Sequence, residues 1–138
     1  MSTPPASAGR QLVLIVEDEE GVRTVWERAV TALGYEAIVA GDAEAAMQML
    51  SPPPDVAILD VHLPGESGLW LSEEIRKVSP TTAIVLATGD NRIPPKDTLA
   101  PHVTAYLVKP FPAGKFQKAV RTAMEWSEAE RARRSRFS

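Results

Sequence analysis

Short runs of consecutive apolar residues alternate along this chain with stretches whose apolar residues recur every three or four positions. The apolar runs cover residues 12–16, 37–40, 56–59, 83–87 and 105–108. Runs this short, bounded by turn residues, are typical of strands buried on both faces of a sheet. The stretches between them have helical spacing, so strand and helix alternate five times. This rhythm predicts a single α/β domain, with a parallel sheet and helices on both of its faces.

Turn and capping residues set the expected limits of the helices. Gly34 is predicted to stop the helix of residues 21–33, and Asp42 to cap the helix of residues 43–50. The segment 91–102 contains three prolines and leaves room for barely two helical turns. We therefore expect this segment to differ from a regular helix.

Composition limits the class of protein. The chain has 138 residues, which fits one domain, and 44% of them are hydrophobic, which is enough for a core. The absence of cysteine excludes disulfides and thiolate metal sites. No apolar run approaches the roughly 20 residues that span a bilayer, so we expect a cytoplasmic protein without a membrane partner.

Charge is spread unevenly. Residues 127–138 carry four arginines against two glutamates, whereas the formal net charge of the whole chain is −3. The body is therefore acidic, which argues against direct nucleic-acid binding. We expect residues 1–10 to be a disordered leader, 11–125 the folded domain, and 126–138 a basic helical extension or linker. The arginine tail is interpreted as a solvated helix end, and Trp26, Trp70 and Trp126 as packing or partner-surface residues.

Polar side chains follow four of the five predicted strands. Glu17 and Asp18 come after the first strand, Asp60 after the third, Thr88 after the fourth and Lys109 after the fifth. The carboxyl ends of parallel strands meet at one edge of an open α/β sheet, where ligands bind. We therefore expect three carboxylates, one hydroxyl and one ammonium to converge there.

This set of side chains suits phosphoryl transfer to a carboxylate. Three neighbouring carboxylates need a cation, and oxygen ligands favour Mg²⁺ or Mn²⁺ over zinc. Asp60 is predicted to be the nucleophile that accepts the phosphoryl group. Lys109 would pair with this group, and Thr88 would donate a hydrogen bond to it. The aspartyl phosphate formed is labile, as a transient signal requires.

Four short segments carry a family resemblance, and they are residues 16–19, 59–65, 87–89 and 106–111. In this order and at these separations they resemble the receiver domain of bacterial two-component response regulators, across residues 11–125. The resemblance implies the flavodoxin-like (βα)5 fold, with strand order 2-1-3-4-5. It also implies phosphorylation by a histidine kinase or a histidine phosphotransfer protein.

The resemblance also implies roles for particular residues. Mg²⁺ would be held by Asp18, Asp60 and the backbone carbonyl of His62, with Glu17 acting mostly through water. The Lys109–Pro110 peptide would be cis. Two further positions would tune the loss of the phosphoryl group, and one aromatic residue would switch conformation. These are His62 and Asp90 for tuning, and Tyr106 for the switch. Two alternatives without these roles stay open: His62 as a solvated loop residue, and Tyr106 as a plain strand residue.

The leading hypothesis is a phosphorylation-driven switch that is not an enzyme beyond its own phosphorylation and dephosphorylation. We expect no output domain on this chain, and a downstream protein target; a homodimer is left open. The alternative is a pseudo-receiver that binds proteins without phosphate. A haloacid dehalogenase-type hydrolase would need a second aspartate two positions after Asp60, where His62 stands.

Overall fold

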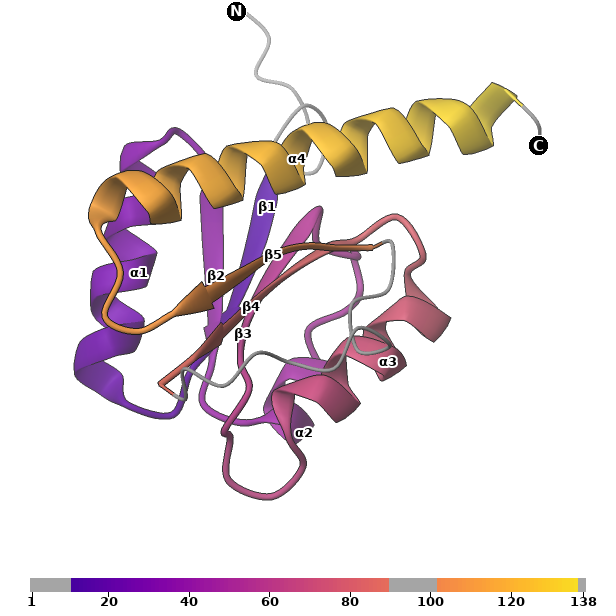
Figure 1. Ribbon diagram of the computed structural model, residues 1–138. Coiled ribbons are helices and arrows are strands. Elements are labelled where there is room, and N and C mark those ends of the chain that lie inside the picture. The colour runs from indigo at the N-terminus through magenta and orange to yellow at the C-terminus, as the bar shows by residue number, and fades with distance from the viewer. Residues whose placement is uncertain (1–10, 90–101, 137–138) are drawn as a thin grey trace, which may run out of the picture.

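The computed structural model describes residues 11–89 and 102–136 and shows a parallel five-stranded sheet between two helical layers (Figure 1). Its elements in chain order are β1 (Leu12–Val16), α1 (Glu20–Ala32), β2 (Glu36–Ala40), α2 (Ala43–Met47), β3 (Val56–Asp60), α3 (Gly68–Val78), β4 (Ala83–Thr88), β5 (Val103–Val108) and α4 (Ala113–Arg136). The strand order is β2-β1-β3-β4-β5, so the predicted flavodoxin-like order is confirmed. Asp90, the leader 1–10 and nearly all of the proline-rich segment lie outside the described residues.

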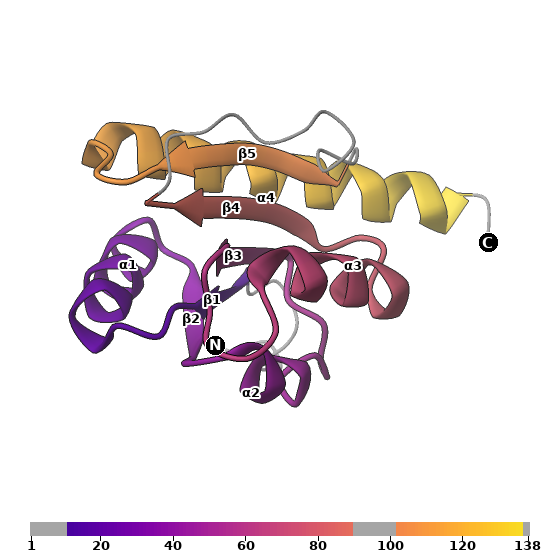
Figure 2. The same ribbon diagram turned by 60° about the horizontal axis from the view of Figure 1, so that its bottom comes forward.

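Helices α1 and α4 pack on one face of the sheet, and α2 and α3 pack side by side on the other (Figure 2). The core on one face contains Trp26 and Val30 of α1 together with the buried stripe of α4. The core on the other face contains Leu71 and Ile75 of α3 together with the alanines of α2. Every residue of β3 is buried. Because β3 has layers on both sides, its sequence is uniformly apolar until the terminal Asp60.

The register places the carboxyl ends of the central strands side by side. Val16 of β1 lies opposite Leu59, and Asp60 of β3 lies opposite Ala87. Thr88, the last residue of β4, lies opposite Val108. The residues that end or directly follow these strands therefore share one edge, as the alternating pattern predicted.

The helix limits agree with the capping signals, with one correction. Gly34 has a φ of 93°, a left-handed conformation that suits glycine and ends α1. The Asp42 carboxylate accepts the Ala45 N–H at 2.7 Å, as an N-cap should. However, α2 ends at Met47 and not at residue 50. The N–H groups of the next two residues bond three positions back, which tightens the chain before the prolines at 52–54.

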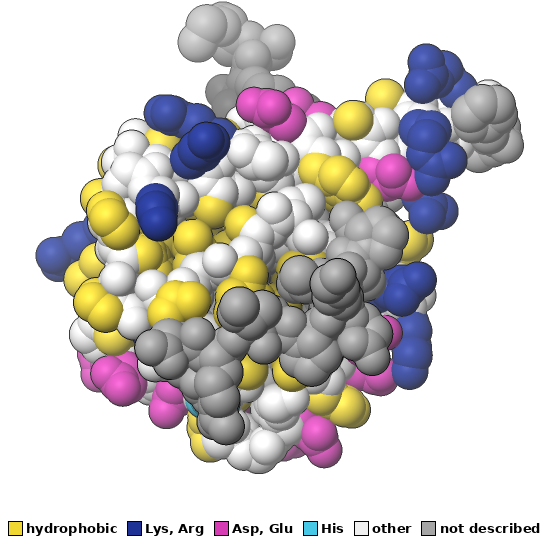
Figure 3. Space-filling view, in the orientation of Figure 1, with side chains coloured by type: hydrophobic (Ala, Val, Ile, Leu, Met, Phe, Trp, Pro, Cys, Tyr) yellow, Lys and Arg dark blue, Asp and Glu magenta, His cyan; other side chains and the backbone are white. Residues whose placement is uncertain are grey.

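Helix α4 continues past the sheet to Arg136, and its last turn is basic. The Ser127 hydroxyl donates to the Thr81 carbonyl at 2.7 Å, and Arg131 pairs with Asp55. The helix is therefore held against the sheet for most of its length. Lys and Arg side chains gather at its free end (Figure 3). Among the described helices, none has both the length and the apolar character that a bilayer span requires.

Candidate functional site

Side chains from three strands meet at the carboxyl edge of the sheet. Glu17 directly follows β1, Asp60 ends β3, and Lys109 directly follows β5. The Lys109 ammonium donates to Glu17 Oε1 at 2.7 Å and to Asp60 Oδ2 at 2.8 Å. Lys109 is 92 positions from Glu17 and 49 from Asp60 in the chain, yet the three side chains form one hydrogen-bonded group. The sheet topology produces this meeting, because each residue stands at the same end of its strand.

The backbone around Asp60 orients its carboxylate. Oδ1 of Asp60 accepts the His62 N–H at 2.8 Å, while the His62 side chain is exposed. Behind this turn, α3 begins at Gly68, whose N–H donates to the Val61 carbonyl. A Cβ on Gly68 would lie 2.1 Å from the Asp60 carbonyl oxygen, so a side chain does not fit there. The sequence analysis assigned Gly68 no role, because this close approach of two backbone segments leaves no mark in the local pattern.

The acidic residues form the one group of potential metal ligands found among residues 11–89 and 102–136. Carboxylate oxygens of Glu17, Asp18 and Asp60 all lie within 4.8 Å of one another. Glu17 is fully buried, Asp60 is nearly so, and Asp18 is exposed. Three carboxylates face one ammonium, so an excess of negative charge remains when all of them are ionised. At such distances each like-charge pair repels by about 4 kcal/mol at an effective dielectric near 20.

The pKa values of buried Glu17 and half-buried Lys109 are shifted by this crowding. Burial raises the pKa of Glu17, and the neighbouring Asp18 and Asp60 raise it further, against the lowering effect of Lys109 and the Glu19 N–H. Burial alone would lower the pKa of Lys109, but its hydrogen bonds with Asp60 and Glu17 outweigh that and raise it. The lysine therefore stays charged, and the acids compete for it.

A divalent cation fits this group of residues. All the donor atoms are carboxylate oxygens, the ligands that Mg²⁺ prefers, and Lys109 neutralises only part of their charge. Exposed Asp18 leaves one side of the cluster open to water, so an ion could enter. Glu17, Asp18 and Asp60 are the side chains that would hold it. The backbone carbonyl of His62 remains a predicted further ligand.

The other predicted residues lie around this group. Thr88 is fully buried at the end of β4, and its carbonyl accepts the Lys109 N–H at 2.7 Å. The Lys109–Pro110 peptide is cis, as the resemblance implied. Tyr106 is half-buried on β5, opposite Leu86, and packs against the core of the α2–α3 face. The predicted roles of Thr88, Tyr106 and His62 stay predictions.

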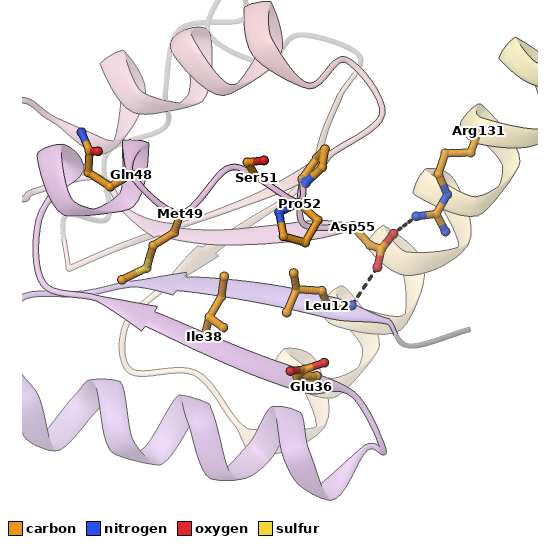
Figure 4. A pocket seen from close by; sticks show the side chains of 10 residues that line it. Leu12, Glu36, Ile38, Gln48, Met49, Ser51, Pro52, Asp55 and Arg131 are labelled. Atoms are coloured by element: carbon orange, nitrogen blue, oxygen red, sulfur yellow. Dashed lines mark hydrogen bonds and ion pairs between the residues drawn. The ribbon is translucent and has the colours of Figure 1, made fainter. Parts of the chain in front are cut away.

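A cavity of about 670 Å³ lies at the opposite, amino edge of the sheet (Figure 4). Leu12, Ile38, Met49 and prolines supply most of its apolar wall. The buried carboxylate at its rim, Asp55, already pairs with Arg131. Because its buried acid has its own cation, this cavity lacks the unbalanced charge of the carboxyl edge. The acidic group around Asp60 is therefore the better candidate site.

The fold and the site together define an α/β protein with a cluster of three carboxylates and one lysine at the carboxyl edge of a parallel sheet. The family model of the response regulator receiver domain matches residues 13–121. The chain therefore belongs to the response regulator receiver domain family, and the predicted resemblance is confirmed.

Two of the curated relatives are named as transcriptional regulators. The uncharacterized transcriptional regulatory protein YrkP of Bacillus subtilis is 32% identical over 99 residues, which cover 72% of this chain and 43% of that protein. A probable transcriptional regulator, ycf27 of Guillardia theta, is 34% identical over 119 residues, covering 83% of this chain and 46% of that protein. The chain spans about half the length of the curated relatives it matches.

Solved structures agree in fold. The signal receiver domain of an HD domain-containing protein from Pseudomonas fluorescens Pf-5 has a TM-score of 0.81 and 29% identity, covering 90% of this chain and 93% of that one. The response regulator protein TrrA from Thermotoga maritima, solved in complex with Mg²⁺-BeF, has a TM-score of 0.74 and 29% identity. The match covers 82% of this chain and 98% of the Thermotoga chain.

Proposed function

We propose that this chain is a phosphorylation-driven signalling switch in which Asp60 accepts a phosphoryl group from a histidine of a partner protein. The observation that carries the proposal is the contact of Lys109 with both Asp60 and Glu17, within a cluster of three carboxylates. Membership in the receiver family and the Mg²⁺-BeF complex of the related Thermotoga regulator support it. Beryllium fluoride serves as a stand-in for a phosphoryl group.

The site would act by positioning and by charge. The Asp60 carboxylate is fixed through the His62 N–H and through Lys109, so one of its oxygens can attack the phosphorus in line. The new O–P bond forms as the P–N bond of the phosphohistidine breaks, and the imidazole leaves with the electron pair. A bound Mg²⁺ would neutralise the carboxylates and the phosphoryl oxygens. Lys109 would then turn from Asp60 to a phosphoryl oxygen, and Thr88 would donate to another.

The product would signal until water attacks the phosphorus, which releases phosphate and restores the carboxylate. The chain would thus catalyse only its own phosphorylation and dephosphorylation, and would not be an enzyme for other substrates. Thr88 and Tyr106 are the proposed elements that change conformation, and Asp90 and His62 the proposed tuning positions. The proposed partners are a histidine kinase or a histidine phosphotransfer protein upstream and a protein target downstream.

Intact-mass spectrometry after treatment with acetyl phosphate and Mg²⁺ tests the acceptor. The wild-type chain should gain the mass of one phosphoryl group, and Asp60→Asn should gain none. Excess chelator should block labelling of the wild-type chain, because the carboxylates would then repel the incoming group.

Asp55→Asn provides a matched control, since Asp55 is the buried carboxylate directly before the amino end of the same strand. It should be labelled to the wild-type extent while folded. Labelling of Asp60→Asn, or an unlabelled wild-type chain that still binds its partner, would contradict the proposal. The second outcome would favour the phosphate-independent binding module.

A further inference from the structure

The Lys109 side chain has a third neighbour besides its two carboxylates. Its ammonium lies 5.2 Å from the centre of the Trp26 ring. Cations within about 6 Å of an aromatic face are attracted by the ring quadrupole, and indole is the best of the side-chain rings for this contact. The ammonium is thus bounded by Glu17, by Asp60 and by the indole.

Trp26 is itself held rigidly. It is only 5% exposed, and its ring centre lies 6.1 Å from those of Phe111 and Phe116. These two phenyl rings stack on each other at 6.0 Å. Phe111 follows the Lys109–Pro110 peptide directly, and Phe116 begins the buried stripe of α4. The indole that contacts the lysine therefore projects from α1 and packs against the loop after β5 and against α4.

The other core-facing positions of α1, such as Val22 and Val30, are aliphatic, and only position 26 of this face has a ring. What only an aromatic ring adds is a negative face toward the ammonium, together with shielding from water. The Lys109 side chain is 25% exposed, so its stem and head would otherwise have more freedom to turn outward. A lysine side chain loses considerable rotamer entropy when it is fixed in one conformation. A third contact, with the indole, helps to offset that loss and limits the conformations that the Lys109 side chain can adopt.

We propose that Trp26 is a positioning residue for Lys109, whose indole face holds the ammonium in line with Asp60 and thereby speeds acceptance of the phosphoryl group. This inference rests on the proposed function. It assigns to α1 a part in the chemistry, although α1 supplies none of the predicted acidic or basic groups. It also makes the aromatic cluster of Trp26, Phe111 and Phe116 the link between the lysine and the packing of α1 against α4.

The initial rate of labelling by acetyl phosphate in saturating Mg²⁺ tests the proposal. Trp26→Leu keeps an apolar side chain but removes the ring, and should slow labelling about five- to thirtyfold, as loss of a shielded cation–π contact implies. Trp26→Phe keeps a ring face and should restore the rate to within about threefold of wild type. Trp126→Leu makes the same change in a residue of α4 that packs against the same core, and should leave the rate unchanged.

A labelling rate of Trp26→Leu equal to wild type would overturn the proposal, as would a Trp26→Phe variant as slow as Trp26→Leu. If the wild-type chain is not labelled, the proposed function fails. The contact is then tested separately, by fluorescence in a Trp70→Phe/Trp126→Phe background where Trp26 is the one indole. Lys109→Met in that background should shift the emission of Trp26, because a charge next to the ring is removed. An unchanged emission would overturn the contact. The same measurement serves as the test of the contact if the Trp26→Leu variant fails to fold.

Discussion

Strand β3 has a buried carboxylate near each end, and the two are neutralised in opposite ways. Asp55, directly before the strand, accepts the Leu12 N–H at 2.7 Å and pairs with the Arg131 guanidinium (Figure 4). Asp60, at the carboxyl end, shares Lys109 with Glu17, and Asp18 adds a further negative charge. The amino end is balanced, whereas the carboxyl end has more acid than base.

The difference separates a structural carboxylate from a reactive one. A buried acid with its own cation and its own N–H donor is satisfied, so losing one partner destabilises the fold, and the acid offers nothing to a ligand. A cluster with excess negative charge is destabilised until a cation binds, and binding energy is then available for function. Burial alone does not distinguish the two, because both carboxylates are at most 5% exposed.

Removing the shared cation should have the largest effect on the reactive end. We expect Lys109→Met to slow labelling by acetyl phosphate about 10²- to 10³-fold, as the loss of one preorganised charged donor does elsewhere. Lys77→Met is the control, since Lys77 pairs with Glu74 on the exposed face of α3. It should be labelled at the wild-type rate. A Lys109→Met rate within a few-fold of wild type, with the fold intact by circular dichroism, would remove Lys109 from the mechanism.

Breaking the balanced end should reduce stability and spare the chemistry. Asp55→Asn should lower the free energy of unfolding in urea by about 1–3 kcal/mol, less than a wholly buried pair costs because Arg131 is 45% exposed. Glu130→Gln alters the exposed pairs of Glu130 with Arg133 and Arg134 on the same helix. It should give no resolvable change. Equal stability of Asp55→Asn and wild type would show that this pair does not anchor α4.

Removing one of the excess negative charges at the carboxyl end should raise stability, in contrast to breaking the balanced pair. In metal-free buffer Asp18→Asn should raise the melting temperature by about 2–4 °C, as a gain near 1 kcal/mol would. Added Mg²⁺ should stabilise the wild-type chain more than the variant and so remove this advantage. Glu44→Gln, an exposed acid on α2, is the control and should not respond to Mg²⁺. An unchanged or lower melting temperature for Asp18→Asn would mean that the three carboxylates do not repel one another.

The smallest effect concerns a buried histidine outside both ends of β3. Burial lowers the pKa of His102 from its ordinary value of 6.5, and nearby Arg76 lowers it further, against the raising effect of Glu73 and Ser72. The folded state therefore disfavours the proton, so stability is fully present above pH 6.5 and declines as the pH falls from 6.5 toward the lowered value. His102→Gln should flatten this decline in melting curves, whereas His62→Gln, at the exposed histidine, should not. A decline unaltered in His102→Gln would contradict the assignment.

Much of the fold could be predicted because its signals are local. The buried strands have uninterrupted apolar runs, and Gly34 and Asp42 mark helix ends by their own conformational preferences. The end of α2 was predicted three residues too late, because periodicity extends to Leu50 while the prolines that follow tighten the last turn. The point where a helix ends before a proline depends on the backbone geometry, and the apolar pattern does not report that geometry.

Within the candidate site, the residues that follow strands could be found and those that support them could not. Glu17, Asp60 and Lys109 interrupt or end apolar runs, which makes them conspicuous. Trp26 was interpreted as a packing or partner-surface residue, because apolar spacing on a helix does not reveal which charge the ring faces. Gly68 is required by a backbone only 2.1 Å from its missing Cβ, a distance that sequence does not encode locally.

The sequence by itself determined the alternation of strands and helices and the kinds of side chain placed at the strand ends, because hydrophobic burial and local propensity depend on residue type and spacing. Only the tertiary structure decided which carboxylate shares its cation and which has its own. Asp55 and Asp60 are both acids beside the same apolar strand. Their partners, Arg131 and Lys109, come from 76 and 49 residues away, and electrostatic balance depends on distances that arise only when the sheet and its helices pack.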